Sequence, residues 1–223
     1  MTKQALIIGL GQFGMSLARA LADRAFEVLA VDRDEGLVSQ ASSFAAEAAT
    51  FDATDEPALA RTGPDQRDIC ICAIGHEARD ASILCTALLR QLGARRLVAR
   101  ATDPLHERIL LQVGADEVVN PERAFGERLA ARLALRGVLE EVPLGDGMTI
   151  TELEPPPVLV GRSLVDAALP SRFGVTVVTV RRPADEGGGV EPPDPRRPLR
   201  ADDVLVVVAR SGAVARMIGK LAG

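Results

Sequence analysis

Three glycines near the start of the chain have the spacing of a phosphate-binding loop. They lie in the segment Gly9-Leu10-Gly11-Gln12-Phe13-Gly14, after an apolar run at residues 5–8 and at the start of a helical pattern at 13–24. Glycines at this spacing permit a tight turn and let backbone N–H groups approach phosphate oxygens at a helix N-terminus. The spacing alone is a weak signal, but here it occurs in the strand-turn-helix context that the motif requires.

An acidic residue follows the second apolar segment, where such sites contact a ribose. Asp32 comes directly after residues 27–31, about 20 residues beyond the loop. A carboxylate there accepts hydrogen bonds from both ribose hydroxyls and repels a 2′-phosphate, which favours NAD, ATP, ADP or AMP over NADP. Two alternatives stay open: the adjacent Arg33 is of the type that accommodates that extra phosphate, and Asp32 can instead cap a helix or turn.

Two further predicted strands end at the same edge of the sheet. Asp52-Ala53-Thr54 follows one of them, and Ala73-Ile74-Gly75 ends the other. In an open α/β sheet a ligand binds beyond the carboxyl ends of the strands, where the strand order reverses. Small residues and backbone groups there fit a flat adenine ring and its sugar. The alternative is that both segments are ordinary strand-to-helix turns.

An alternation of apolar runs and helical patterns must position these residues. The predicted strands are residues 5–8, 27–31, 46–51, 68–74, 97–101 and 117–119. Helical spacing connects them at 13–24, 35–42, 78–92 and 104–113. This order predicts a doubly wound parallel α/β sheet, the Rossmann fold. A longer helix follows at 121–136, with Asn120 as its candidate N-cap; it either closes the domain or reaches a neighbouring subunit.

A different pattern begins near Val142. Strands are predicted at 148–153, 175–180 and 204–209, with a short helix at 164–168, a loop rich in Gly and Pro at 182–198 and a final helix from Ser211. This is the pattern of a small α+β domain. We therefore predict a nucleotide-binding domain with its crossover helix at 1–137 and a ligand-binding or dimerisation domain at 144–223, with the boundary between Gly137 and Leu144.

Composition excludes several classes of function. With 47% hydrophobic and 26% charged residues the chain is typical of a globular protein, and a net charge of −5 argues against sequence-independent binding of nucleic acid. Spanning a membrane takes an apolar run of about 18 residues, and neither such a run nor a signal-peptide core is present. We therefore expect a cytoplasmic protein.

Residues for catalysis are scarce. The sequence contains neither Tyr nor Trp, and its two histidines, His76 and His106, have no partner that the sequence identifies. His76 follows the strand end at Gly75; we expect a solvated loop residue, and the alternative is that it faces the ligand. Cys70, Cys72 and Cys85 are too few and too close for a disulfide framework, and we expect them to be buried apolar residues. We assign no catalytic residue and expect a protein that is not an enzyme.

Several segments together resemble the cytosolic regulatory proteins of the Ktr and Trk potassium-uptake systems. They are the glycine loop, Val31-Asp32, Ala73-Ile74-Gly75, Val113-Gly114-Ala115-Asp116 and Asn120-Pro121-Glu122. The resemblance implies a homodimer that assembles into a ring, commonly an octamer, on the cytoplasmic face of a membrane potassium-translocating subunit. Nucleotide exchange would then bias the transporter between two states of the ring.

The resemblance also implies roles for individual residues. Ktr-type members bind ATP and ADP, and Trk-type members are associated with NAD and NADH. By similarity, Gly9, Gly11 and Gly14 hold phosphates, Asp32 and Arg33 the ribose, Asp52, Ala53 and Thr54 the adenosine, and Ala73, Ile74 and Gly75 the adjoining wall. Arg100 matches a basic position that reaches phosphate, and Glu122 a carboxylate that helps to hold a divalent cation such as Mg²⁺. Gln12 replaces an arginine that many ATP-binding relatives carry, which puts the discrimination of ATP from ADP in doubt.

Ktr-type relatives can also bind cyclic di-AMP in their C-terminal part. Residues 169–176 and Pro192-Pro193 resemble the segments that form that pocket, although Pro170 replaces a common arginine. The candidate residues for this second ligand are Arg172, Phe173, Gly174, Val175, Pro192 and Pro193. The alternative is that this domain only dimerises. For the whole chain, the alternatives are an NAD-dependent oxidoreductase and a regulator of another cation transporter.

Overall fold

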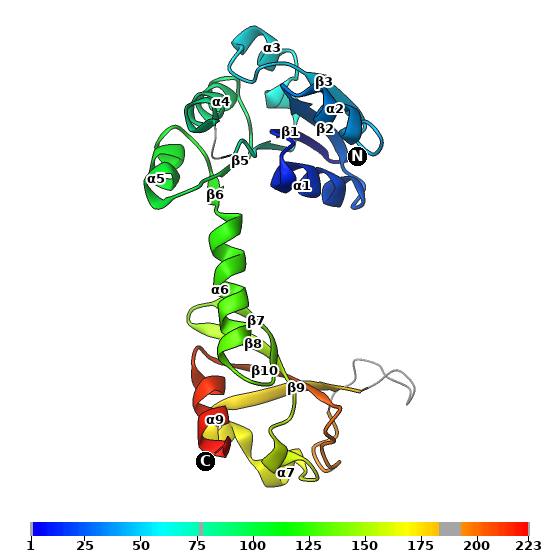
Figure 1. The fold of residues 1–223 in the computed structure, drawn as a ribbon, viewed down its shortest axis with the longest axis vertical. Helices are drawn as coiled ribbons and strands as arrows, with labels where there is room; N and C mark the ends of the chain where they lie inside the picture. The colour runs from blue at the N-terminus through cyan, green and yellow to red at the C-terminus, as the bar shows by residue number, and fades with distance from the viewer. Residues whose placement is uncertain (1, 76–77, 183–192, 223) are drawn as a thin grey trace. The chain divides into compact units, whose positions relative to one another are not determined.

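A computed structural model describes residues 2–75, 78–182 and 193–222 of the chain (Figure 1). Its contacts divide the chain into two compact units, Met1–Arg123 and Ala124–Gly223. His76 and Pro192, two residues considered from the sequence, lie outside the described residues. Within the described ranges, no helix is long and apolar enough to cross a membrane.

The first unit is built on a six-stranded parallel sheet in the order β3-β2-β1-β4-β5-β6. Its strands are β1 (Gln4–Ile8), β2 (Glu27–Asp32), β3 (Glu47–Thr50), β4 (Ile69–Cys72), β5 (Leu97–Arg100) and β6 (Glu117–Val119). Because β1 lies between β2 and β4, the strand order reverses there, which makes this edge the topological switch point. The predicted doubly wound fold is confirmed.

Helices cover both faces of this sheet (Figure 1). On one face lie α1 (Gln12–Ala22) and α2 (Glu35–Ala41); on the other lie α3 (Glu56–Ala60), α4 (Arg79–Gln91) and α5 (Pro104–Gln112). Successive residues of β1 alternate between the two cores, since Ala5 and Ile7 pack with α1 and α2 while Leu6 and Ile8 pack with α4 and α5. A short 3-10 helix, Pro64–Gln66, precedes β4.

Aspartate caps fix where three of these helices begin. Asp34 accepts backbone N–H bonds at the start of α2, Asp55 at the start of α3 and Asp103 at the start of α5. Each cap satisfies helix N–H groups that have no partner within the helix. The helices therefore start close to the carboxyl edge of the sheet, where the predicted site lies.

The helix α6 (Pro121–Ala134) follows β6 and ends two residues earlier than predicted. Asn120 acts as its predicted cap, since its Oδ1 accepts the N–H of Arg123 at 2.9 Å. None of the residues of α6 is buried, and the side chains of Phe125 and Leu133 are 65% and 73% exposed. This helix gains little from apolar packing within one chain.

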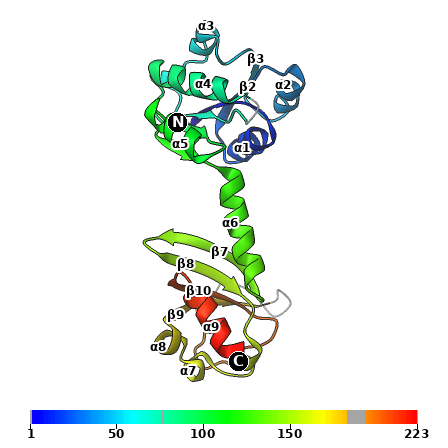
Figure 2. The ribbon, with the colours of Figure 1, turned by 60° about the vertical axis from the view of Figure 1, so that its left-hand side comes forward.

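The second unit is a four-stranded antiparallel sheet in the order β7-β8-β10-β9, with short helices on one face (Figure 2). Its strands are β7 (Val138–Gly145), β8 (Met148–Leu153), β9 (Val175–Arg181) and β10 (Val204–Arg210). Its helices are the 3-10 turn Pro157–Leu159, α7 (Leu164–Ala167), α8 (Leu169–Phe173) and α9 (Ala213–Ala222). The predicted small α+β domain is confirmed.

The strand β7 is an element that the sequence reading missed. Residues 138–143, expected to connect the domains, instead pair with β8 in a hairpin. Its turn is Asp146-Gly147, and both residues have positive φ, 50° and 71°. Asp-Gly is the sequence that a two-residue hairpin turn favours, because both positions require that conformation. This dipeptide between two strand patterns was the signal that would have found the hairpin.

Candidate functional site

A pocket of about 440 Å³ opens at the carboxyl edge of the parallel sheet, at the ends of β1, β2, β4 and β5. It is lined by Ile8, Gly9, Gly11, Asp32, Arg33, Leu37, Phe51, Asp52, Ala53, Ala73, Ile74, Gly75, Ala78, Ala81 and Arg100. Its volume lies within the usual range of small-molecule sites, roughly 300–1,000 Å³. Residues predicted from five separate segments thus come together here. Phe51, which precedes Asp52 at the end of the predicted strand, lines the pocket as well, whereas sequence reasoning missed the apolar lining from Ile8, Leu37, Ala78 and Ala81.

The glycine loop has a separate structural reason for each glycine. Gly9 has a φ of +92°, and a Cβ placed on it would lie 2.8 Å from the backbone nitrogen of Ile74. A Cβ on Gly14 would overlap the carbonyl oxygen of Gly9, so this glycine lets α1 pack against β1. A Cβ on Gly11 would meet nothing within 4 Å. Gly11 therefore leaves open space beside the pocket that it lines.

The first turn of α1 is a ready site for an anion. The helix begins at Gln12, and within the described chain no side chain caps its N-terminus. The free N–H groups and the positive end of the helix dipole favour negative charge there. Gln12 and Phe13 lie in this turn but do not line the pocket themselves.

Asp32 is held at the pocket by two backbone donors. Its Oδ2 accepts the N–H of Leu10 at 2.6 Å, and its Oδ1 accepts the N–H of Asp34 at 2.9 Å. An ionised carboxylate offers about four acceptor positions, so each oxygen can accept a further bond from a ligand hydroxyl. Asp32 thus also fixes the glycine loop, a role that the sequence pattern did not indicate.

The end of β3 forms a polar turn at the pocket rim. Asp52 Oδ1 accepts hydrogen bonds from the backbone N–H of Thr54 at 2.9 Å and from its hydroxyl at 2.7 Å. The backbone bond is the main reason why the pKa of Asp52 lies below its usual range. Asp52 and Ala53 line the pocket, whereas Thr54 does not. Thr54 contributes by orienting Asp52.

Arg100 is the cation that connects the pocket to the elements behind it. Its side chain is 15% exposed, its guanidinium forms an ion pair with Glu122 and it lies 5.6 Å from the centre of the Phe13 ring. One of its terminal nitrogens would lie 3.6 Å from a Cβ on Gly75. Glu122 and Phe13 do not line the pocket, so both contact it through Arg100.

The fit of a divalent cation depends on Glu122 together with groups from outside the chain. Among the described residues, no group of three or more His, Cys, Asp or Glu side chains is arranged to hold a metal. Glu122 offers one carboxylate, 62% exposed and paired with Arg100. Phosphate oxygens of a ligand would have to supply the other positions.

The Gly114-Ala115-Asp116 segment supports the pocket from a distance. Arg90 donates to the carbonyl of Gly114 at 2.7 Å and forms an ion pair with Asp116 at 2.7 Å. Asp116 also accepts the N–H of Leu97 at 2.7 Å, which is the main cause of its lowered pKa, followed by Arg90. A Cβ on Gly114 would lie 2.6 Å from Cγ of Arg90. This segment ties α4 to the start of β5 and does not line the pocket.

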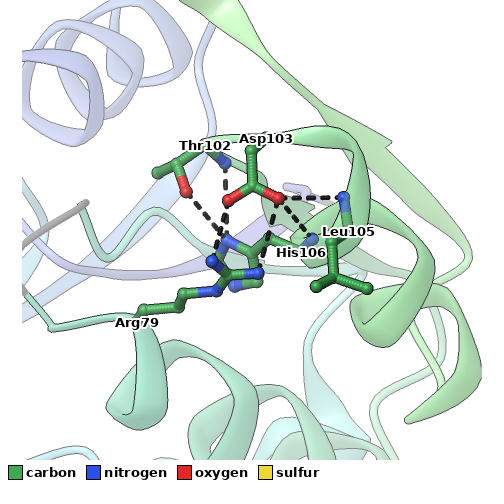
Figure 3. A network of polar contacts seen from close by, with 5 residues as sticks. All are labelled: Arg79, Thr102, Asp103, Leu105 and His106. Carbon is green, nitrogen blue, oxygen red and sulfur yellow. Dashed lines mark hydrogen bonds and ion pairs between the residues drawn. The ribbon is translucent and has the colours of Figure 1, made fainter.

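A second polar network joins α4 to α5 beside the pocket (Figure 3). Arg79 forms an ion pair with Asp103 at 2.8 Å, and Asp103 accepts the backbone N–H groups of Leu105 and His106. The bond from His106 is the main reason why the pKa of Asp103 is lowered. The buried His106 ring lies 3.3 Å from the Thr102 hydroxyl, a partner that the sequence did not identify. This contact gives His106 a structural role.

The three cysteines are buried and free, as predicted. Burial raises the pKa of Cys70 to about 12, whereas the hydrogen bond with Cys72, followed by burial, raises the pKa of Cys85 well above its usual value. Thiols of this kind are unreactive at neutral pH. Cys70 and Cys85 therefore pack as small apolar side chains.

Four of the residues predicted for a second ligand, Arg172, Phe173, Gly174 and Val175, lie where α8 joins β9. Arg172 donates to the carbonyl of Ala167 at 3.2 Å and lies over the Phe173 ring, 5.0 Å from its centre. Gly174, with a φ of +67°, ends α8, and the side chain of Val175 is fully buried. Pro170 occupies the first turn of α8, which tolerates proline. Pro193 is half-buried.

Comparison with known proteins places both units in described families. Residues 5–121 match the TrkA-N domain and residues 147–222 the TrkA-C domain. The chain is 34% identical over 219 residues to the Ktr system potassium uptake protein A of Vibrio alginolyticus, covering 98% of each chain. It is 32% identical over 216 residues to the Ktr system potassium uptake protein C of Bacillus subtilis, covering 97% of this chain and 96% of the relative.

Solved structures share the fold. The RCK domain of GsuK matches all of this chain and 48% of its own, with a TM-score of 0.68 and 17% identity. The GsuK channel bound to NAD matches all of this chain and 40% of its own, with a TM-score of 0.67 and 18% identity. Because the sequence relatives extend over nearly the whole chain and both domain types occur in the same order, the chain belongs to the family of Ktr and Trk potassium-uptake proteins, with a TrkA-N domain followed by a TrkA-C domain.

Proposed function

We propose that this chain is a regulatory subunit of a potassium-uptake system that binds an adenine nucleotide in the pocket of its first unit. The observation that carries the proposal is the arrangement of the pocket wall. It combines the open side of Gly11, the uncapped start of α1, the Asp32 carboxylate and the Arg100 guanidinium. Donors for phosphate and an acceptor for ribose thus face one cavity. The names of the relatives indicate that the regulated process is potassium uptake.

For the ligand, we favour ATP and ADP over NAD and NADH. The Ktr relatives are the more similar, at 32–34% identity over nearly the full chain, whereas a Trk-type homologue from Methanothermobacter thermautotrophicus is 27% identical over 143 residues. Solved structures of GsuK carry NAD in one case and ADP in another. A neutral Gln12 in the first turn of α1 gives no charge-assisted contact with a third phosphate. Discrimination of ATP from ADP would then depend on Arg100 and on a metal at Glu122.

The metal role has its own test. When ATP is bound, Glu122 would hold a divalent cation such as Mg²⁺ together with the terminal phosphate. Changing Glu122→Gln should weaken the binding of ATP in Mg²⁺ while affecting that of ADP less. Titration calorimetry of both nucleotides measures this. Equal loss for ATP and ADP, or loss for neither, would contradict the role.

We propose that the working form is a ring of homodimers, commonly an octamer, docked on the cytoplasmic side of a membrane potassium-translocating subunit. The exposed apolar side chains of α6, Phe125 and Leu133, support contact with another subunit, because α6 buries none of its residues in one chain. The second unit would dimerise and bind cyclic di-AMP through the α8–β9 junction. Of the predicted domain limits, 1–137 and 144–223, we propose to keep the first and to extend the second domain back to Val138, because β7 belongs to its sheet. The mass of the purified assembly, measured by light scattering, tests the ring.

The first experiment is thermal unfolding of the purified protein with ATP, ADP, NAD, NADH and cyclic di-AMP, each with and without Mg²⁺. A ligand at about 100 times its Kd adds roughly 2.7 kcal/mol to the free energy of unfolding. Stabilisation by ATP and ADP, with ATP alone responding to Mg²⁺, is expected. Stabilisation by NAD and NADH only would favour the Trk-type ligand, and turnover of NADH with a substrate would favour an oxidoreductase. The alternative function, regulation of another cation transporter, predicts the same nucleotide binding. Only the identity of the membrane partner distinguishes it from regulation of potassium uptake.

A further inference from the structure

Arg100 joins the pocket to the first turn of α6. The guanidinium belongs to the pocket wall, yet its ion pair is with Glu122, the second residue of α6. We propose that a phosphate group of the bound nucleotide competes with Glu122 for Arg100, so that filling the pocket releases the start of α6. This inference rests on the proposed function, because it takes the nucleotide pocket as given and names how occupancy is transmitted.

The two partners of this ion pair differ in exposure. Arg100 is 15% exposed, so its charge has lost most of its hydration and requires an anion or a polar partner. Glu122 is 62% exposed and returns to water at little cost in free energy. A ligand phosphate can therefore replace Glu122 without leaving either charge unsatisfied. The guanidinium lies over the Phe13 ring, 5.6 Å from its centre, and this contact would keep Arg100 at the pocket after Glu122 is released.

Charges elsewhere in the pocket leave Arg100 as the cation at the phosphate end. Among the described residues of the lining, Arg33 and Arg100 are cationic. Arg33 directly follows Asp32, at the ribose end, whereas Arg100 contacts Phe13 in the first turn of α1. With Gln12 in that turn, no charged side chain of the turn competes for the phosphates. The competition between a ligand phosphate and Glu122 therefore depends on Arg100.

Few contacts hold the first turn of α6, so the loss of one contact should destabilise this turn. The helix has no buried residue. Its first turn is held by the Arg100–Glu122 pair, by the Arg123–Glu107 pair at 3.2 Å and by the Asn120 cap. Because binding linkage is reciprocal, the strength with which Glu122 holds Arg100 must also lower the affinity for the nucleotide. Removing the charge of Glu122 should then strengthen nucleotide binding in the absence of a metal.

The test is titration calorimetry of the full chain with ADP and with ATP in EDTA. Glu122→Gln should bind both nucleotides roughly 3- to 10-fold more tightly than the unchanged protein, the scale of a partly exposed ion pair. Glu107→Gln is the matched control, because it breaks the other ion pair of the same turn without touching Arg100; its affinities should stay within about twofold of the unchanged protein. In an Arg100→Gln background, adding Glu122→Gln should produce no gain.

Hydrogen exchange at the amides of residues 124–128 supplies a second readout. In the unchanged protein, ADP in EDTA should speed exchange there; in Glu122→Gln, exchange should already be fast and ADP should leave it unchanged. If the unchanged protein binds nucleotide and Glu122→Gln binds it equally well or more weakly, the competition between phosphate and Glu122 for Arg100 is overturned. The assignment of the pocket would then still stand. If the unchanged protein binds no nucleotide at all, the proposed function is overturned, and the competition for Arg100 is overturned with it.

Discussion

The two units of the chain use their sheets differently. In the first, parallel strands bring five separate segments to one edge, where they line a single pocket. In the second, the strands are antiparallel, a hairpin joins β7 to β8, and Arg172, predicted to contact a ligand, donates instead to the carbonyl of Ala167. A parallel sheet gathers loops at one edge because all its strands end there. Substitutions in the two units test this contrast.

Gly14→Ala should have the largest effect. Its Cβ would overlap the carbonyl of Gly9, so α1 must move away from the loop. We expect the free energy of unfolding of the first unit to fall by about 3 kcal/mol, the upper part of the range for overpacking. Gly219→Ala in α9 is the matched control, because a Cβ there meets nothing within 4 Å. It should stabilise the second unit by about 0.5–1 kcal/mol. Denaturant unfolding measures the free energy of unfolding of both variants. Equal losses of stability in the two variants would contradict the different roles of these glycines.

Asp32→Ala should weaken binding of every ligand that carries a ribose by roughly 1–3 kcal/mol, the scale of hydrogen bonds to a charged group. The variant also removes the acceptor that fixes the N–H of Leu10, so the glycine loop is held less rigidly and inorganic tripolyphosphate should bind more weakly too. Asp34→Ala, which removes the cap of α2, is the control: it should lower stability and leave nucleotide affinity unchanged. Calorimetry measures the affinities. Unchanged nucleotide binding in Asp32→Ala would mean that the pocket is misassigned.

Asp116→Asn should reveal the acid sensitivity of the contacts that Asp116 makes with Arg90 and with the backbone of Leu97. The folded-state pKa of Asp116 is lowered, so its stabilising contribution is present above the ordinary carboxylate pKa and is lost as pH falls toward the folded value. At pH 7 the variant should be less stable by about 1 kcal/mol, the usual value for a hydrogen bond. The difference from the unchanged protein should shrink between pH 5 and pH 3 (about the range of carboxylate titration). A difference that is constant with pH would contradict this.

Pro170→Arg should have the smallest effect on the fold and a specific effect on the second ligand. Pro170 is exposed in the first turn of α8, at the position where the resemblance to Ktr-type proteins implies an arginine. We expect stability to change by less than about 0.5 kcal/mol, as for most surface substitutions. Thermal shift with cyclic di-AMP should increase relative to the unchanged protein. If neither form responds to cyclic di-AMP, the second unit serves dimerisation.

Local patterns explain most of what was predictable. The glycine loop, Asp32 and the strand ends at Ala73 and Asp52 are recognisable because each lies in or next to a strand with a clear apolar run. The hairpin of β7 and β8 was missed although Asp146-Gly147 signals it, because residues 138–145 alternate weakly and are mostly exposed. The lining residues Ala78 and Ala81 were missed because small residues in a helix carry no chemical signal of their own.

The sequence by itself determined the doubly wound fold, the phosphate-binding turn and the acidic residue at the end of β2, since these depend on short-range periodicity and on glycine conformations. Only the tertiary structure decided which charges meet. Arg100 pairs with Glu122, Arg90 with Asp116 and Arg79 with Asp103, and each pair joins different elements. A chain with 26 Lys and Arg and 31 Asp and Glu offers many possible pairings. Packing of the elements selects among them, because an ion pair forms only where the fold brings both side chains within reach.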